Sequence, residues 1–162
     1  MIAADIMTEA PRTIRQSDPI REALDALQSM QVHHLPVVDE EGELVGMLSD
    51  RDLGSRMNMF IEGADADLAA VPLSSRRVSE FMSANVASVT VATDLTSVIE
   101  TLLEQHIGAV PVVDGDGAVV GIISYVDVLR TFAAVSEADE TRPTRRMKPV
   151  KQKASKEKVA HR

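Results

Sequence analysis

Pro36-Val-Val-Asp-Glu-Glu-Gly-Glu-Leu-Val-Gly-Met-Leu-Ser-Asp-Arg-Asp52 and Pro111-Val-Val-Asp-Gly-Asp-Gly-Ala-Val-Val-Gly-Ile-Ile-Ser-Tyr-Val-Asp127 are two versions of one sequence. They lie within a longer duplication, in which residues 7–53 align with residues 82–128 at a constant offset of 75 and without a gap. Of the 47 aligned positions 11 are identical, and nine of these fall in the quoted stretch. Similarity at a fixed offset indicates a repeated structural unit. We therefore expect one unit built twice.

Each copy predicts the same elements: a short strand, a helix, a two-stranded hairpin and a second helix. In the first copy these are a strand at 13–15, a helix capped by Asp18, and strands at 35–38 and 44–48. The second copy repeats them with a strand at 88–91, a cap at Thr93, and strands at 110–113 and 119–123. The Ser-x-x-Asp pattern after each hairpin predicts a capping box that opens the second helix.

The domain organisation follows from the duplication and predicts a mixed α/β (α+β) fold. The first repeat spans residues 1–57, a connector spans 58–77, and the second repeat spans 78–135. A unit of about 50 residues is too small to bury a sheet alone, so we expect the repeats to pack with pseudo-two-fold symmetry. Residues 136–162 are charged and interrupted by proline, which is typical of a disordered tail.

Composition excludes several classes of site. The chain has no cysteine, which excludes disulfides, thiolate metal sites and a cysteine nucleophile. With only three Phe, one Tyr and no Trp, it also has few aromatic residues on which single-stranded nucleic acid can stack, which disfavours this class of partner. We expect a cytoplasmic protein without a membrane partner, because no signal peptide and no long apolar run are visible.

The charge is divided unevenly along the chain. The net charge is −8, but residues 142–162 carry +8 and the rest of the chain carries −16. All lysines lie in this basic tail. Binding to nucleic acid, if any, is therefore expected from the tail alone.

The pattern of Pro-Val-Val-Asp, a glycine turn and Gly-x-x-Ser-x-x-Asp resembles the CBS domain, and its duplication resembles the tandem pair called the Bateman module. The opening Asp5-Ile6-Met7 and the closing Leu129-Arg130-Thr131-Phe132 are similar to stand-alone bacterial two-CBS proteins of the acetoin-utilisation protein B type. The resemblance covers about residues 2–132. It implies a regulatory sensor of adenine nucleotides that modulates a partner protein. It implies no enzyme, no catalytic residue, no metal and no catalytic cofactor.

The resemblance also implies a regulatory ligand, which is AMP, ADP, ATP or S-adenosylmethionine, and two sites for it. Asp52 and Asp127 would accept hydrogen bonds from ribose hydroxyls, and Ser49 and Ser124 would meet phosphate at helix N-termini. The implied first site comprises Thr13, Ile14, His33, His34, Gly46, Ser49, Arg51 and Asp52. The implied second site comprises Ser88, Val89, Gly108, Ala109, Gly121, Ser124 and Asp127.

The two sites are expected to differ because Arg51 aligns with Val126, and Asp50 with Tyr125. If Arg51 faces inward and Asp50 outward, the first site favours phosphate-rich ligands.

Other interpretations remain open at this point. Ser-x-x-Asp caps many helices that bind nothing, and His33-His34 without nearby ligating residues fits packing better than a metal site. Contact with a phosphate is a further alternative for His34. An alternative function is an interaction scaffold whose basic tail contacts nucleic acid or an acidic partner. A homodimer is expected from apolar helix faces that a small monomer would leave exposed. These faces carry Leu53, Met57, Phe60, Val128, Leu129 and Phe132.

Overall fold

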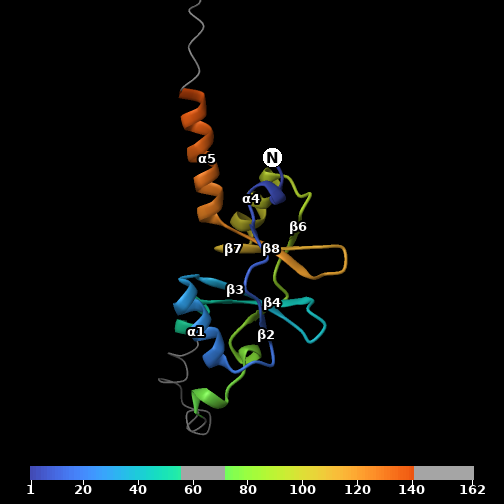
Figure 1. Ribbon diagram of the computed structural model, residues 1–162, viewed down its shortest axis with the longest axis vertical. Coiled ribbons are helices and arrows are strands. Elements are labelled where there is room, and N and C mark those ends of the chain that lie inside the picture. Colours follow the sequence, from blue (N-terminus) through green and yellow to red (C-terminus); the bar gives the residue numbers. More distant parts are fainter. Residues whose placement is uncertain (56–71, 141–162) are drawn as a thin grey trace, which may run out of the picture.

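Two four-stranded sheets form the framework of the protein. The structure is a computed structural model that describes residues 1–55 and 72–140. The first sheet has the order β2-β3-β4-β5 and the second has the order β1-β8-β7-β6. Figure 1 shows the two units one above the other. The strands of the first sheet are β2 (Ile14–Arg15), β3 (His34–Val38), β4 (Leu44–Ser49) and β5 (Ser83–Ala84). Those of the second are β1 (Thr8–Glu9), β6 (Val89–Thr90), β7 (Ala109–Val113) and β8 (Val119–Ser124).

The helices follow the predicted duplication. Helices α1 (Ile20–Met30) and α4 (Leu95–Glu104) are the equivalent first helices of the two repeats, and their buried residues recur at helical spacing. The second helix begins directly after each hairpin, as a helical segment at residues 50–55 and as α5 (Tyr125–Glu140). No helix in the described part of the chain is long and apolar enough to cross a membrane. The mixed α/β fold with two repeats is thus confirmed.

In both repeats the N-cap of the first helix lies one residue after the predicted cap. Asp18 Oδ2 accepts a hydrogen bond from the Arg15 amide at 2.9 Å, and Thr93 Oγ1 accepts one from the Thr90 amide at 3.0 Å. Both side chains therefore close the turn before the helix. Pro19 and Asp94 are the N-cap residues instead, and Asp94 accepts a hydrogen bond from the Ser97 amide.

The opening segment of each repeat packs on the other unit. The segment η1 (Ala3–Asp5) and β1 joins the second sheet, where Thr8 pairs with Ile122. The equivalent segment, η3 (Val78–Glu80) and β5, joins the first sheet, where Ala84 pairs with Gly46. Residues 1–10 thus belong to the first repeat in sequence but pack on the second sheet, an exchange that was not expected from the sequence.

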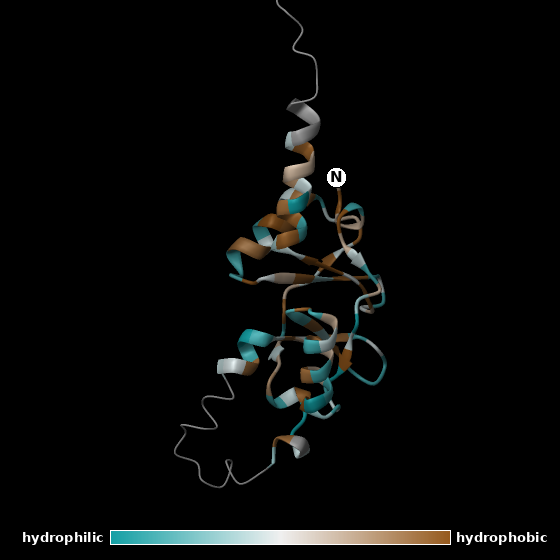
Figure 2. Cartoon of the chain, turned by 60° about the vertical axis from the view of Figure 1, so that its left-hand side comes forward, coloured by the Kyte–Doolittle hydropathy of each residue, from teal (hydrophilic) through white to brown (hydrophobic). Residues whose placement is uncertain are grey.

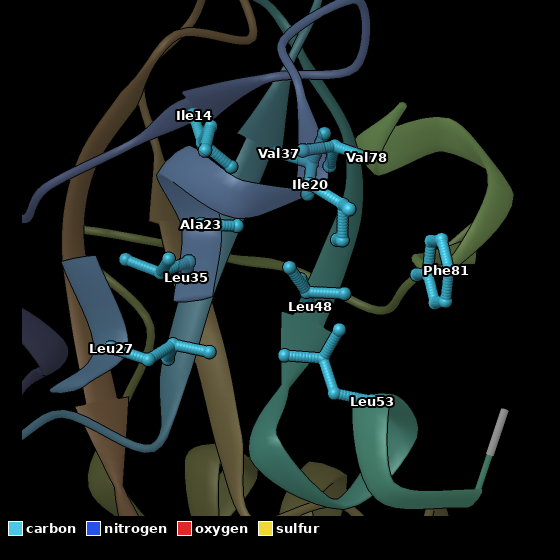
Figure 3. Close-up of a cluster of buried hydrophobic side chains, with 10 residues drawn as sticks. All are labelled: Ile14, Ile20, Ala23, Leu27, Leu35, Val37, Leu48, Leu53, Val78 and Phe81. Atoms are coloured by element: carbon cyan, nitrogen blue, oxygen red, sulfur yellow. The ribbon is translucent and has the colours of Figure 1, made fainter. Parts of the chain in front are cut away.

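Each unit has a hydrophobic core of its own, and the exchanged segments complete both. Val78 and Phe81 lie fully buried in the first core, beside residues of α1, β3 and β4 (Figure 3). Ala3, in the exchanged segment η1, is likewise buried in the second core. Burying a side chain such as Phe81 contributes about 2–3 kcal/mol, so the exchanged segments are part of the stability of the unit they join.

The hairpins join the two units at one end of the sheets. The Leu44 amide donates to the Gly117 carbonyl at 3.1 Å, and Glu43 bridges to Ala118. Strand β3 also contacts β8.

The last helix is longer than predicted. Residues 136–140, assigned to the tail, continue α5, whose final turns extend away from the second unit (Figure 1). The expected disorder of the rest of the tail lies outside the described residues, as does most of the connector.

Candidate functional site

Both Ser-x-x-Asp patterns form the predicted reciprocal capping boxes. Ser49 Oγ donates to Asp52 Oδ2 at 2.6 Å, and the Asp52 amide donates back to Ser49 Oγ at 3.0 Å. In the second unit, Ser124 Oγ donates to Asp127 Oδ2 at 2.5 Å, and the Asp127 amide donates back at 3.3 Å. One oxygen of each carboxylate is therefore held by the cap, and both side chains are only partly buried.

The second oxygen differs between the two carboxylates. Asp127 Oδ1 lies 3.6 Å from a guanidinium nitrogen of Arg130, one turn along α5. The residue equivalent to Arg130 in the first repeat is Ser55. Within the described residues, Asp52 Oδ1 has no partner. Arg130 was not among the residues predicted for the second site, because it lies one helical turn after Asp127 and outside the repeated pattern.

Arg51 does not occupy the place that the sequence suggested. Its side chain is exposed and pairs with no other group in residues 1–55 or 72–140. Asp50 instead turns toward a predicted site residue: its Oδ2 lies 2.8 Å from His33 Nδ1. This hydrogen bond lowers the pKa of the Asp50 carboxyl below its ordinary value. Asp50, rather than Arg51, thus contacts a residue predicted for the first site.

His34 reaches from the first unit to the second. Its ring atoms lie about 2.9 Å from the point where a Cβ on Gly108 would be, so the ring fits only because residue 108 is glycine. The ring of Tyr125 lies 4.0 Å from the same point. Burial lowers the pKa of His34 from its usual 6.5, and His33 adds to this, while the carboxylates of Asp50 and Asp52 oppose it. His34 thus lies beside residues predicted for the second site.

Gly46 and Gly121 accommodate protein rather than an open space. A Cβ on Gly46 would lie 2.7 Å from the Ser83 carbonyl oxygen and 2.8 Å from Met82 Sδ. A Cβ on Gly121 would overlap the side chain of Met7. Both glycines are needed for close packing of the exchanged opening segments, a role that the sequence analysis did not predict.

The strand residues predicted for the two sites are divided between core and surface. Ile14 and Val89 are buried members of the two cores, so only their backbone is available to a ligand. Ala109 is also buried, Thr13 is half-buried and Ser88 is exposed. The side chains of Ile14 and Val89 therefore contribute to the two cores.

Comparison with known proteins places these features in a family. The family model described as "CBS domain" matches residues 3–57 and 78–134. Among curated proteins, an uncharacterised 33.4 kDa protein of Thermofilum pendens is 36% identical over 127 residues, which are 75% of this chain and 42% of that protein. An L-aspartate semialdehyde sulfurtransferase of Methanocaldococcus jannaschii is 29% identical over 131 residues, which are 81% of this chain and 23% of that protein. The chain thus spans less than half the length of these relatives.

Three solved structures share the fold. The CBS domain pair of protein MJ0100, in complex with 5′-methylthioadenosine and S-adenosyl-L-methionine, has a TM-score of 0.70 and 27% identity, covering 83% of this chain and 98% of that one. CBSX2 in complex with AMP has a TM-score of 0.70 and 28% identity over the same shares of the chains. A putative acetoin utilization protein, AcuB from Vibrio cholerae, has a TM-score of 0.70 and 25% identity, covering 88% of this chain and 98% of that one.

Three observations agree: the capping box occurs twice, the family model matches two segments, and solved CBS pairs share the fold of this chain. The resemblance to stand-alone CBS pairs is confirmed. This chain belongs to the CBS domain family and contains two CBS domains in tandem.

Proposed function

We propose that this protein is a regulatory CBS pair that binds an adenosine-containing ligand and changes its contacts with a partner protein in response. The observation that carries the proposal is the duplicated capping box, which presents a partly buried carboxylate at the start of a helix in each unit. A carboxylate oxygen suits the paired hydroxyl donors of a ribose. Structural neighbours bind AMP, or 5′-methylthioadenosine and S-adenosylmethionine, which supports a ligand of this class.

The proposed binding residues are those predicted from the sequence, with roles adjusted to the structure. Asp52 and Asp127 bind the ribose, and Ser49 and Ser124 hold those carboxylates in place. Ligand contacts at Ile14 and Val89 are made by backbone groups. A ligand can regulate only if it binds one arrangement of the units, or of two subunits, better than another. The candidate ligands are AMP, ADP, ATP and S-adenosylmethionine.

The proposed role is not catalytic, and we place the protein in the cytoplasm. The relative with an enzyme name supports this only indirectly, because the match covers 23% of that enzyme's length. This share is consistent with a regulatory module attached to a separate catalytic part.

We also propose a homodimer, formed through helices that carry exposed apolar side chains. On α5, Leu129 is 61% exposed and Phe132 is 52% exposed, and Leu103 of α4 is 67% exposed. Figure 2 shows apolar residues on α5 both beside the second sheet and further along the helix. Leu53 and Val128, which were expected in this face, are buried in the two cores instead. Met57 and Phe60 lie outside the described residues.

Isothermal titration calorimetry with AMP, ADP, ATP, S-adenosylmethionine and NAD tests the ligand proposal. We expect at least one of the first four to bind, and the double variant Asp52→Asn, Asp127→Asn to lose affinity by roughly a hundredfold at each site. Asparagine remains competent at a helix start, so the unliganded variant should keep its thermal stability. Unchanged binding in the double variant would show that these carboxylates are not the ligand site.

The alternative is a scaffold whose basic tail binds nucleic acid or an acidic protein. Its specific support is the +8 charge of residues 142–162. On this alternative the full chain binds DNA or RNA with an affinity that falls steeply as salt rises, and removal of residues 142–162 abolishes binding. The same deletion leaves ligand affinity unchanged if the tail has no part in the regulatory site.

A further inference from the structure

The residue that follows each capping serine occupies an equivalent place in the two units. The Asp50 amide donates to the His33 carbonyl at 3.1 Å, and the Tyr125 amide donates to the Gly108 carbonyl at 3.1 Å. The side chains keep the same neighbours: Asp50 bonds the His33 ring, and the Tyr125 ring lies beside Gly108. Positions 50 and 125 therefore form the same part of the wall around each proposed ligand site.

The charge at this position differs between the units. Asp50 adds a second carboxylate beside His34, because the carboxylates of Asp50 and Asp52 both raise the pKa of that ring. The hydrogen bond with His33 lowers the pKa of Asp50 and so favours its ionised form. Arg51 does not offset this charge beside Asp50, because consecutive residues of a helix point in different directions.

The second unit has the opposite balance. Tyr125 is uncharged where the first unit has Asp50, and the guanidinium of Arg130 lies beside Asp127. The Arg130 side chain is 77% exposed, which leaves it accessible to a ligand. The first site thus presents two carboxylates, whereas the second presents a carboxylate and a cation.

We propose that Asp50 is the specificity-determining residue of the first site, where it disfavours adenosine ligands that carry a 5′-phosphate and admits those whose 5′ group is uncharged or cationic. This inference rests on the proposed adenosine-binding function. The physical reason is repulsion between like charges, which is only partly screened at a few ångströms. The second site, with Arg130 and without a counterpart of Asp50, accepts the phosphate.

The test uses the full chain carrying Asp127→Asn, so that the second site is weakened and the first is measured. AMP and 5′-methylthioadenosine are titrated into this background protein and into the same protein carrying Asp50→Asn. We expect 5′-methylthioadenosine to bind both with affinities within about twofold, and AMP to bind the Asp50→Asn protein about fivefold more tightly. Asp116→Asn is the matched control, because Asp116 is an exposed carboxylate in the β7–β8 hairpin; it should change neither affinity.

A second variant distinguishes the effect of the Asp50 charge from the effect of a local change in fold. Asp50→Tyr introduces the residue of the second repeat and should also raise the affinity for AMP. If 5′-methylthioadenosine binds but neither substitution at Asp50 raises the affinity for AMP, the inference is wrong and the proposed function stands. If no adenosine ligand binds the wild-type protein or any variant, the proposed function fails and this inference fails with it.

Discussion

Ala10 and Asn85 are equivalent residues with the same unusual backbone and different side chains. Their φ angles are 44° and 54°, in the left-handed region that asparagine and glycine adopt more easily than alanine. We expect Ala10→Gly to raise the free energy of unfolding by about 1 kcal/mol, because it removes the steric cost at this position. Urea denaturation measures the change.

The matched variant is Asn85→Ala, which places alanine in the same backbone conformation of the other repeat. It should lower the free energy of unfolding by a similar amount. Equal stabilities of Ala10→Gly and the wild-type protein would show that the left-handed conformation costs nothing here.

His34 makes the stability of the protein depend on pH near neutrality. Because burial lowers its pKa from 6.5, the unfolded chain takes up a proton at a higher pH than the folded protein does. The stabilising contribution is complete above about pH 6.5 and is lost as the pH falls through the pKa of the folded state. We expect the melting temperature to fall between pH 7.5 and pH 5.5.

His34→Gln should reduce this fall, because glutamine does not titrate. His106→Gln is the control, since His106 is exposed on the second unit. The charged and titratable neighbours of His34 are Asp50, Asp52 and His33. An unchanged pH dependence in His34→Gln would contradict the assignment to this residue.

At the scale of the element, Gly46 and Gly121 should respond differently to the same substitution. Beside Gly46 lies a backbone oxygen of β5, which can move only with its strand, whereas beside Gly121 lies the flexible side chain of Met7. We expect Gly46→Ala to lower the free energy of unfolding by about 2 kcal/mol and Gly121→Ala to lower it by less.

A double-variant cycle separates the two cases. Met7→Ala should recover part of the stability lost in Gly121→Ala, because the new methyl group then has room. Met82→Ala should recover little in Gly46→Ala, because the Ser83 carbonyl remains. Full recovery in the second pair would show that Met82, and not the strand, is the obstacle.

The same elements show what the sequence could predict. The hairpins and capping boxes are local, and each appears twice, so the duplication identified them. Strands β1 and β5 have two residues each, too few for an alternating pattern, and β1 pairs with residues more than 100 positions away. The contact of His34 with Gly108 also joins residues that are far apart in the sequence, so it could not be predicted from a local pattern.

At the scale of the whole molecule, the exposed side chains of α5 predict how two copies associate. Leu129→Glu with Phe132→Glu introduces charge into the exposed apolar face without touching either core. We expect this variant to remain folded and to run as a monomer of about 17 kDa in light scattering at micromolar concentration, where the wild-type chain runs at twice that mass.

Gln28→Glu with Ser29→Glu on α1 adds the same charge at exposed positions outside this surface, and this control should leave the mass unchanged. A wild-type chain that is monomeric under these conditions contradicts the proposed dimer.

The exchange of opening segments also sets an order in time. During synthesis β1 is made long before its partner, since it pairs with β8, the last strand of the described chain. The first sheet, in contrast, is complete as soon as Ala84 has emerged. On a ribosome stalled before Val119, the growing chain therefore holds one finished sheet and an unpaired β1, so a protease would cut near residues 8–9 before it cuts the first sheet.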